Sequence, residues 1–313
     1  MKGNLRPVAF IVGMLLACEA VWSGSLTTDN LTVNQQSTLS GQVAIGPVVL
    51  STNAVPTNNY VVMYTFDTNT TPVADGSTNG NSGTVTNATW TNGGKIGGAY
   101  VFDGSNSFIS ASDSASLDIR AALTISGWAR FDSASSLRML VAKHDDSSQR
   151  AYDLYFDNGA LYCQVSSSGS GSAHYSFNTA GDVSSATWTH YVVTWDGTAN
   201  SNGRIYVNGA SQTVQTASAT FSGTNIFNSS MPFRVGAKSN GGWYFAGAID
   251  DVRVYDYALS EGDVLALYQS GVGTITQSLT VDASVPTTLS GTTTITRLVK
   301  QGDVEMGVYT NGP

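Results

Sequence analysis

Residues 245–260 constrain the fold of this chain more than any other stretch of its sequence. Apolar and polar residues alternate through most of this stretch, as they do in a strand that buries one of its two faces. The adjacent carboxylates Asp250–Asp251 stand near the start of the strand. Ser260 follows with Asp263 three positions later, a shortened capping box that begins a helix. The stretch therefore predicts a half-buried strand followed by a helix over residues 261–268.

Further strand patterns recur from residue 60 onward, separated by turn-forming runs of Gly, Asn, Asp and Ser and without a long helical period. The expected strands are Tyr60–Phe66, Ala99–Phe102, Leu123–Phe131, Met139–Lys143, Tyr152–Phe156, Leu161–Val165, Thr189–Trp195, Arg204–Val207, Phe233–Gly236 and Ile249–Tyr255. Asn208-Gly209 tolerates the positive φ angles of a tight hairpin turn. The pattern predicts an all-β, antiparallel sandwich.

Residues 1–23 are typical of a signal peptide, with two basic residues near the start and an apolar run over residues 8–17. The run is too short to cross a bilayer as a helix. We therefore expect a secreted, extracellular or cell-surface protein without a transmembrane segment. An alternative stays open, because Leu15-Leu16-Ala17-Cys18 resembles a bacterial lipoprotein box that would anchor the protein through a lipid on Cys18.

The chain is acidic, with 14 basic and 22 acidic side chains and a net charge of −8. Loss of the signal peptide leaves 12 basic and 21 acidic residues, a net charge of −9. Such a chain repels phosphate backbones, which argues against a nucleic-acid partner, and attracts hard cations. Cys163 is the one cysteine after the signal, so no intrachain disulfide is expected. It alternates with apolar residues and is expected to be a buried hydrophobic side chain.

The two flanks of the β-rich segment carry an internal repeat. The pattern Leu31-Thr32-Val33, Leu39-Ser40-Gly41, Ile45 returns as Leu279-Thr280-Val281, Leu289-Ser290-Gly291, Ile295. We therefore divide the chain into a signal peptide (1–23), an N-terminal β-repeat flank (24–58), a middle domain (59–271) and a C-terminal β-repeat flank (272–313). The repeats either pair with each other or wrap with those of other subunits into a β-stalk, which would make the protein a homo-oligomer.

Seven segments of the middle domain follow one another in the order of a known family. They are Tyr64–Asp67, Asp75–Gly83, Gly97–Gly104, Leu123–Trp128, Trp188–Gly197, Ile205–Gly209 and Phe245–Ser260. Together they resemble the laminin-G-like, concanavalin A-like jelly-roll family over about residues 60–270. The resemblance implies two stacked, curved antiparallel sheets. It also implies a secreted binding module, an ancillary domain of an enzyme or an adhesion module, because function in such folds varies more than the fold itself.

The resemblance also implies a structural calcium ion. Asp250 matches an aspartate that binds calcium from the last strand in laminarinase-type relatives. Calcium needs several oxygen ligands. The candidate co-ligands are the side chains of Asp67, Asp75 and Asn79 and the carbonyl group of Gly104. The alternative is that Asp250 and its neighbour Asp251 only pair with Arg253 or accept backbone N–H groups.

The carboxylate inventory argues against catalysis. Jelly-roll glycosidases that cleave β-glucans use two glutamates on one strand face. After the signal peptide this chain has only Glu261 and Glu305, one at the start of the expected helix and one in a flank. The three histidines have no metal-ligand spacing, and no nucleophile turn or phosphate loop is present. We therefore expect no enzyme activity, with a glycoside hydrolase as the less favoured alternative.

Aromatic side chains outside the expected core are the remaining candidates for recognition, because sugar rings stack on flat aromatic surfaces. Trp128 and Trp195 have strand periodicity and are expected in the core. Trp243 and Tyr244 follow a flexible Asn-Gly-Gly turn, and Trp90 is expected in another loop. We interpret these three residues as ligand-binding candidates, against the alternative that their rings only cover the rim of the sandwich.

Three functions follow from these observations. The first is a secreted, non-catalytic module that binds a polysaccharide or a cell-surface glycan and holds a structural calcium. The second is a structural or adhesive subunit in which a jelly roll decorates an oligomeric β-stalk. The third is an enzyme of another type. The scarcity of glutamate disfavours the third, aromatic residues in loops favour the first, and the bracketing repeats favour the second.

Overall fold

A computed structural model describes residues 60–132, 137–198, 200–272, 298–299 and 305–306. The expected signal peptide with Cys18, both copies of the repeat and nearly all of the two flanks lie outside the described residues. In the C-terminal flank only β17 (Leu298–Val299) and β18 (Glu305–Met306) are described, and they pair antiparallel. Within the described residues, no helix has both the length and the apolar character needed to cross a membrane.

The middle of the chain consists of short strands with one helix near the end. In chain order these elements are β1 (Tyr60–Tyr64), β2 (Thr84–Thr86), β3 (Thr89–Thr91), β4 (Ala99–Asp103), β5 (Phe108–Ala111), the 3-10 turn η1 (Ala115–Leu117), β6 (Leu123–Phe131), β7 (Arg138–Lys143), β8 (Arg150–Asp157), β9 (Ala160–Gly169), β10 (His174–Thr179), β11 (Thr189–Trp195), β12 (Arg204–Val207), β13 (Ala210–Ser211), β14 (Val214–Ala219), β15 (Phe233–Val235), β16 (Ala246–Tyr255) and α2 (Glu261–Val272).

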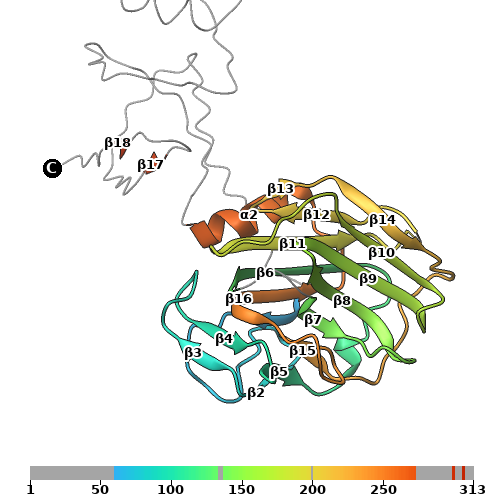
Figure 1. Cartoon of the computed structure of the whole chain (residues 1–313), viewed down its shortest axis with the longest axis horizontal. Coiled ribbons are helices and arrows are strands. Elements are labelled where there is room, and N and C mark those ends of the chain that lie inside the picture. Colours follow the sequence, from blue (N-terminus) through green and yellow to red (C-terminus); the bar gives the residue numbers. More distant parts are fainter. Residues whose placement is uncertain (1–59, 133–136, 199, 273–297, 300–304, 307–313) are drawn as a thin grey trace, which may run out of the picture. The chain divides into compact units, whose positions relative to one another are not determined.

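The described strands of this segment form two sheets of eight strands each (Figure 1). The first sheet has the order β13-β12-β11-β6-β16-β4-β3, with β1 paired to β16, and the second has the order β14-β10-β9-β8-β7-β15-β5-β2. Neighbouring strands pair antiparallel throughout. The expected all-β, antiparallel jelly-roll sandwich is confirmed.

All ten expected strands are present, and β6, β11 and β12 have the expected bounds. The sequence analysis missed β2, β3, β5, β10, β13 and β14. Several of these strands are only two to four residues long, and β14 is largely exposed, so they lack a clear alternation of apolar and polar residues. The hairpin turn at Asn208-Gly209 is confirmed, with φ angles of 52° and 76°.

Aromatic residues from both sheets form the centre of the core. Phe131 of the first sheet packs edge-on against Phe156 of the second, with ring centroids 4.3 Å apart, and Tyr191 lies 4.9 Å from Phe156. Trp195 is buried in this core, as expected. Cys163 is also buried there, as expected, and burial raises the pKa of its thiol well above the usual value. The thiol is therefore protonated at neutral pH and serves as packing.

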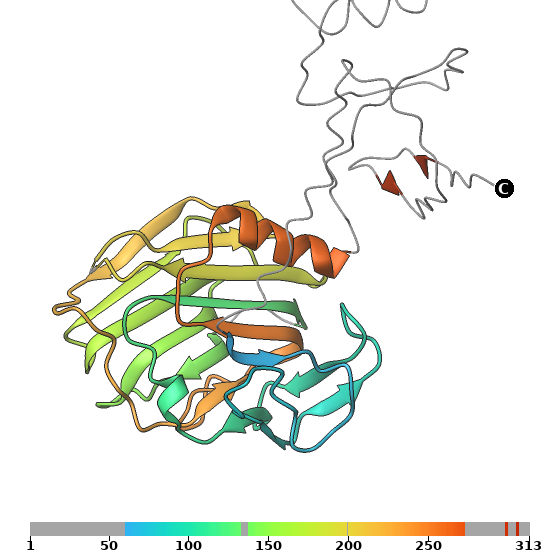
Figure 2. The same cartoon turned by 180° about the vertical axis from the view of Figure 1, so that it is seen from behind.

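Helix α2 covers the outer face of the first sheet, the face that points away from the core (Figure 2). Its N-terminus has the expected capping interaction: the Ser260 hydroxyl donates to Asp263, and the Asp263 N–H donates to the Ser260 hydroxyl. Val264 and Leu267 pack on residues of the sheet. Trp128 is buried as expected, but beneath α2, where Tyr268 stacks on it at 5.7 Å. No helix covers the second sheet in the described part of the chain.

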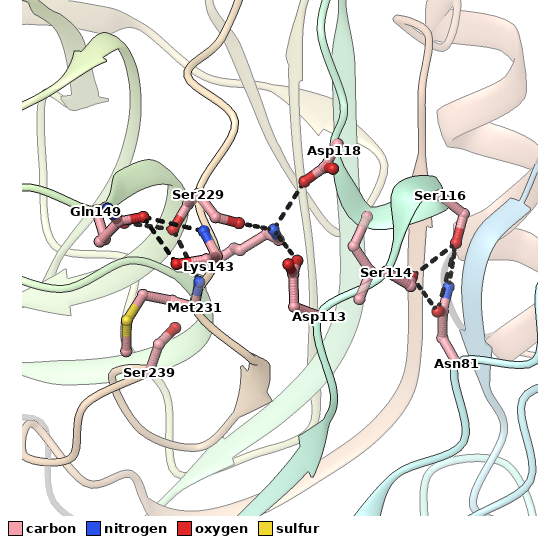
Figure 3. A network of polar contacts seen from close by, with 12 residues as sticks. Asn81, Asp113, Ser114, Ser116, Asp118, Lys143, Gln149, Ser229, Met231 and Ser239 are labelled. Carbon is pink, nitrogen blue, oxygen red and sulfur yellow. Dashed lines mark hydrogen bonds and ion pairs between the residues drawn. The ribbon is translucent and has the colours of Figure 1, made fainter.

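A fully buried lysine joins three segments at one end of the second sheet (Figure 3). Nζ of Lys143, in β7, lies 2.6 Å from Oδ1 of Asp113 and 2.9 Å from Oδ1 of Asp118, on either side of η1. It also donates to the carbonyl group of Ser229. A buried ammonium group is stable only with such partners. The lysine therefore holds η1 and the segment before β15 against β7.

We expect Lys143→Met to lower the free energy of unfolding by about 3 kcal/mol, because two carboxylates and a carbonyl group would lose their shared donor. Urea denaturation followed by circular dichroism measures this change. The control is Arg204→Met, which replaces an exposed arginine on β12 and should change the free energy of unfolding by less than about 0.5 kcal/mol. Equal stability of the two variants would contradict the role given to Lys143.

Candidate functional site

Asp250 is a fully buried carboxylate in the middle of the first sheet. Its Oδ2 accepts a hydrogen bond from the N–H of Ile96 at 2.8 Å, whereas Oδ1 is buried without a hydrogen-bond partner. Burial raises the pKa of Asp250 from 3.8 to about 7, and the charge of Asp251 adds to this increase, whereas the backbone N–H groups of Ile96, Asp251 and Lys95 oppose it. A buried carboxylate oxygen without a hydrogen-bond partner is a candidate position for a cation.

Asp67 lies beside the same loop as Asp250. A Cβ atom on Gly97, which has a φ of 61°, would lie 2.1 Å from Oδ1 of Asp67, so only glycine permits this approach. The preceding residue of the loop, Ile96, is the one that binds Asp250. Two consecutive loop residues thus contact the two carboxylates, so that Asp67 and Asp250 lie against the same loop.

Asp251 takes the alternative role that the sequence analysis considered. Its Oδ1 accepts hydrogen bonds from Nε and Nη2 of Arg253 at 3.1 and 2.9 Å. Burial raises the pKa of Asp251, the Arg253 charge opposes this increase, and nearby Asp67 adds to it. Asp251 has a φ of 47° and lies in a bulge of β16 opposite β6. The pair with Arg253 therefore leaves Asp250 as the unpaired carboxylate of the strand.

The other three predicted calcium ligands lie elsewhere. The carboxylate of Asp75 accepts the N–H groups of Met63 and Asn81, at 3.0 and 2.8 Å, and closes its own loop. The Asn79 side chain donates to the carbonyl group of Tyr60 at 2.7 Å. The N–H of Gly104 donates to Phe245, five residues before Asp250, a separation of about 16 Å along an extended chain. Asp75 and Asn79 thus contact β1 and Gly104 lies at the far end of β4, whereas Asp67 and Asp250 contact the loop before β4.

The loop that Asp75 closes forms one wall of a cleft of about 910 Å³. The apolar residues Val61, Met63 and Ile119 line it together with the polar residues Asn79, Arg120 and Asp256. The cleft lies beside β1 and η1, away from Trp243 and from the two carboxylates at Gly97. It has no buried polar group that lacks a partner, so we do not place the main site there.

Trp243 lies on the outer face of the second sheet, where it meets aromatic residues that the sequence analysis missed. Its ring lies 5.9 Å from the ring of Tyr155, which stacks on Tyr162 at 5.0 Å with an angle of 9° between the planes. Tyr155 and Tyr162 are register partners on β8 and β9. We call the outer surface made by Tyr155, Tyr162 and Trp243 the aromatic face. Tyr244 is half-buried next to Trp243 in the same loop.

A chain of polar contacts holds the loop of Trp243 on the second sheet. Asp153, which is fully buried, contacts Nδ1 of His144, and Nε2 of His144 lies 3.4 Å from Asp146. Asp146 in turn pairs with Lys238, whose Nζ lies 4.3 Å from the centre of the Trp243 ring. This cation covers part of the ring, so Trp243 is anchored as well as half-exposed.

Several buried polar atoms without a hydrogen-bond partner lie on this outer face. Among the described residues they include Nε of Arg150 and Arg234, Oδ1 of Asp153 and Nδ1 of His174. Gln164 donates to the Tyr155 hydroxyl at 2.8 Å and accepts from Nη1 of Arg150 at 3.3 Å. The face therefore combines aromatic rings with hydrogen-bonding groups, which is the composition of a site for a polar ligand with apolar surfaces.

Trp90 does not belong to this face. The sequence analysis expected it in a loop, but it lies in β3, at the edge of the first sheet. Its indole N–H donates to the carbonyl group of Phe66 at 2.8 Å, and its ring packs on the core. The expectation of a loop position was wrong because the strand has only three residues, Thr-Trp-Thr, and gives no alternating pattern.

Comparison with known families adds to this geometry. Residues 103–265, just over half of the chain, match the concanavalin A-like lectin/glucanases superfamily. The chain belongs to this superfamily. The resemblance seen in the sequence is thereby confirmed, and the concanavalin A-like match includes both Asp250 and Trp243. No curated protein matches the chain significantly.

Solved structures share the concanavalin A-like fold at low identity. The binding domain of Paraclostridial Mosquitocidal Protein 1 is 19% identical, with a TM-score of 0.52, over 68% of this chain and 52% of that one. The botulinum neurotoxin serotype C1 binding domain is 14% identical, with a TM-score of 0.52, over the same shares. Domain 4 of AbnA, a GH43 extracellular arabinanase from Geobacillus stearothermophilus, in complex with arabinotriose, is 24% identical, with a TM-score of 0.51, over 67% of this chain and 98% of that one. The chain thus spans about half the length of the two toxin domains, and the likeness shows the fold alone.

Catalytic groups of the glucanase type are scarce in this concanavalin A-like domain. Glu261 is the one glutamate between residues 60 and 272, and it is exposed in the first turn of α2. Within the described residues, no three His, Cys, Asp or Glu side chains lie close enough together to hold a metal ion. A cation at Asp250 and Asp67 would therefore need backbone carbonyl groups as further ligands.

We expect the pH dependence of stability to report on Asp250. Its pKa is higher in the folded than in the unfolded protein, so without a cation its contribution to the free energy of unfolding falls as pH rises from about 4 to about 7. Asp250→Asn removes the buried negative charge that is present at pH 8, so it should raise the thermal midpoint of unfolding in EDTA at that pH. Thermal unfolding at pH 5 and pH 8 measures both effects. Asp256→Asn, at an exposed position just after the strand, is the control and should behave as the unmodified protein.

Proposed function

We propose that this protein is a non-catalytic binding module that holds a carbohydrate on its aromatic face. The observation that carries the proposal is the coincidence of aromatic rings with unsatisfied buried polar atoms on one open surface of the second sheet. Sugar rings present apolar C–H faces and hydroxyl groups, and so match such a surface. The solved arabinanase domain in complex with arabinotriose supports a carbohydrate as the ligand.

The Trp243 loop is the part of this surface that the ligand would contact first. Tyr155 is nearly buried between its neighbours, whereas Tyr162 and Trp243 are half-exposed. Gln164 stands beside them as a hydrogen-bonding group. The ligand would therefore lie across β8 and β9, with Tyr162 and Trp243 in contact with sugar rings and the amide of Gln164 in reach of hydroxyl groups.

We expect Tyr162→Ala and Trp243→Ala each to weaken glycan binding at least tenfold, or about 1.4 kcal/mol, because each removes an aromatic contact. A glycan array followed by calorimetry with the best glycan, and with arabinotriose, measures the affinity. Trp188→Ala is the matched control: this half-buried tryptophan contacts Arg130 of the first sheet, at 5.4 Å, and the variant should bind as the unmodified protein does. Intact binding in both site variants would refute the aromatic face as the site.

We further propose that Asp250 and Asp67 hold a structural calcium ion. The unpartnered Oδ1 of Asp250 and the exposed carboxylate of Asp67 supply the hard, charged oxygen atoms that calcium prefers. The ion would offset the cost of a buried negative charge and so stabilise the first sheet. Its role is structural, because the aromatic face belongs to the other sheet.

Calcium should raise the thermal midpoint of the unmodified protein at pH 8 but have little effect at pH 5, where Asp250 is protonated. Asp250→Asn should abolish the increase. Thermal unfolding in EDTA and in excess calcium measures it, with magnesium as the control ion. An identical midpoint in EDTA and in calcium at pH 8 would exclude the ion.

The structural or adhesive subunit is the second candidate, and the repeat in the two flanks supports it. In this proposal the protein is exported, or anchored through Cys18, and assembles through its flanks into a homo-oligomer. Light scattering of the mature protein would then give a multiple of the mass of one chain. A mass of one chain at high protein concentration would refute the oligomeric stalk, and the binding module would remain as the proposed function.

A further inference from the structure

The end of the aromatic face nearest the turn between β9 and β10 carries a cation, Arg150, that forms no ion pair with a carboxylate of the described residues. Arg150 and His174 lie together there: a Cβ atom on Gly171 would lie 3.6 Å from Nη1 of Arg150, and His174 is hydrogen-bonded to the backbone of Gly171. Burial and then the Arg150 charge lower the pKa of His174, whereas the charge of the more weakly acting Asp153 raises it. The Arg150 cation therefore has a stronger effect on His174 than the Asp153 carboxylate has.

Some polar atoms of Arg150 and His174 lack a hydrogen-bond partner. Nε of Arg150 and Nδ1 of His174 are buried without a hydrogen-bond partner, and Nη1 of Arg150 makes a long contact of 3.3 Å with Gln164. No carboxylate of the described residues lies within ion-pair distance of Arg150. This is unexpected in a segment, residues 60–272, that has 17 acidic and 10 basic side chains.

The carboxylates of this face are either paired or distant. Asp153 contacts His144, and Asp146 pairs with Lys238. Asp157 stands at the opposite end of β8 from Arg150, about 23 Å away along the strand. An anionic group that approaches Arg150 therefore meets one nearby carboxylate, that of the buried Asp153, which contacts His144 and lies beyond ion-pair distance of Arg150.

A serine-rich loop borders the same place. The hydroxyl groups of Ser168, Ser170 and Ser172 follow one another at 2.9 and 2.6 Å, and all three side chains are at the surface. Gly171, which contacts Arg150, belongs to this loop. Serine hydroxyls donate hydrogen bonds to oxyanions without adding charge. The Ser/Gly segment 168–172 before His174 thus lies next to the guanidinium group of Arg150.

We propose that Arg150, His174 and the serine loop form a subsite for the anionic group of an acidic glycan, a carboxylate or a sulfate. The inference rests on the proposed carbohydrate site and names the class of sugar that occupies it. A guanidinium group binds either oxyanion with two parallel hydrogen bonds. A sugar ring on Tyr162 places the next sugar of the chain toward Arg150, because Gln164 joins the hydroxyl of the neighbouring Tyr155 to the guanidinium group.

Calorimetry on the full-length protein tests this subsite with three probes: a galacturonic acid oligomer, a sulfated galactose oligomer and neutral arabinotriose. Arg150→Gln should weaken binding of the acidic probes at least tenfold more than it weakens binding of arabinotriose. The affinity of the unmodified protein for the acidic probes should fall as the salt concentration rises. The affinity of Arg150→Gln should depend less on the salt concentration. Arg150→Lys should keep the salt dependence but lose part of the affinity, because lysine cannot bind two oxygen atoms in parallel. The matched control is Arg120→Gln, which replaces an exposed arginine at the cleft beside β1 and η1.

The outcomes separate this inference from the proposed function. One result supports the subsite: the uronate or the sulfated probe binds more tightly than arabinotriose, and this difference is lost in Arg150→Gln. The probe that binds more tightly identifies the oxyanion. Neutral and acidic probes with equal affinity, in a protein that still needs Trp243, overturn the subsite and leave the carbohydrate site in place. Acidic probes that bind Arg150→Gln as well as the unmodified protein also overturn it. No binding of any glycan refutes both proposals, and equal thermal midpoints of the variants show that their folds are intact.

Discussion

The position of β16 within the first sheet is the constraint on which the rest of this structure depends. The strand pairs with β6, β4 and β1, so it is enclosed by other strands and nearly all of its residues are buried. It nevertheless carries Asp250, Asp251 and Arg253. Buried charges are stable only with partners. The bulge at Asp251 allows one pair to form within the strand, and the loop before β4 approaches to bind Asp250.

Aspartate has a mainly structural role in this acidic chain. Three loops close on a carboxylate of their own, with Asp75, Asp103 and Asp145 each accepting several backbone N–H groups. The N–H groups of Ser105 and Asn106 hold the pKa of Asp103 well below its usual range. Such loops are rigid without disulfides, because each carboxylate replaces several missing backbone partners. An excess of acidic residues therefore does not by itself indicate catalysis or metal binding here.

The two outer faces of the sandwich differ in what covers them, and this difference favours the second sheet as the binding surface. On the first sheet, α2 buries Trp128, His190 and their neighbours. On the second sheet the loop of Trp243 packs on the outer face, held by the ion pair of Lys238 and Asp146, and no helix of the described residues covers it. Half-exposed rings and unpartnered polar atoms are thus left at the surface. This arrangement is costly for stability, which is the usual reason to look for a ligand.

The sequence by itself determined the class of fold, because the period of two in β6, β11 and β16 needs no long-range information. It also determined the hairpin at Asn208-Gly209 and the cap at Ser260, which depend on neighbouring residues only. It indicated Asp250 and Trp243 as candidates, but it could not show what surrounds them. Only the tertiary structure decided that Asp67 and Asp250 contact one loop while Asp75 closes another, because loop paths are set by packing between distant segments. For the same reason Tyr155, Tyr162 and Arg150 could not be identified in advance: they share one face only after β8 and β9 have paired in register.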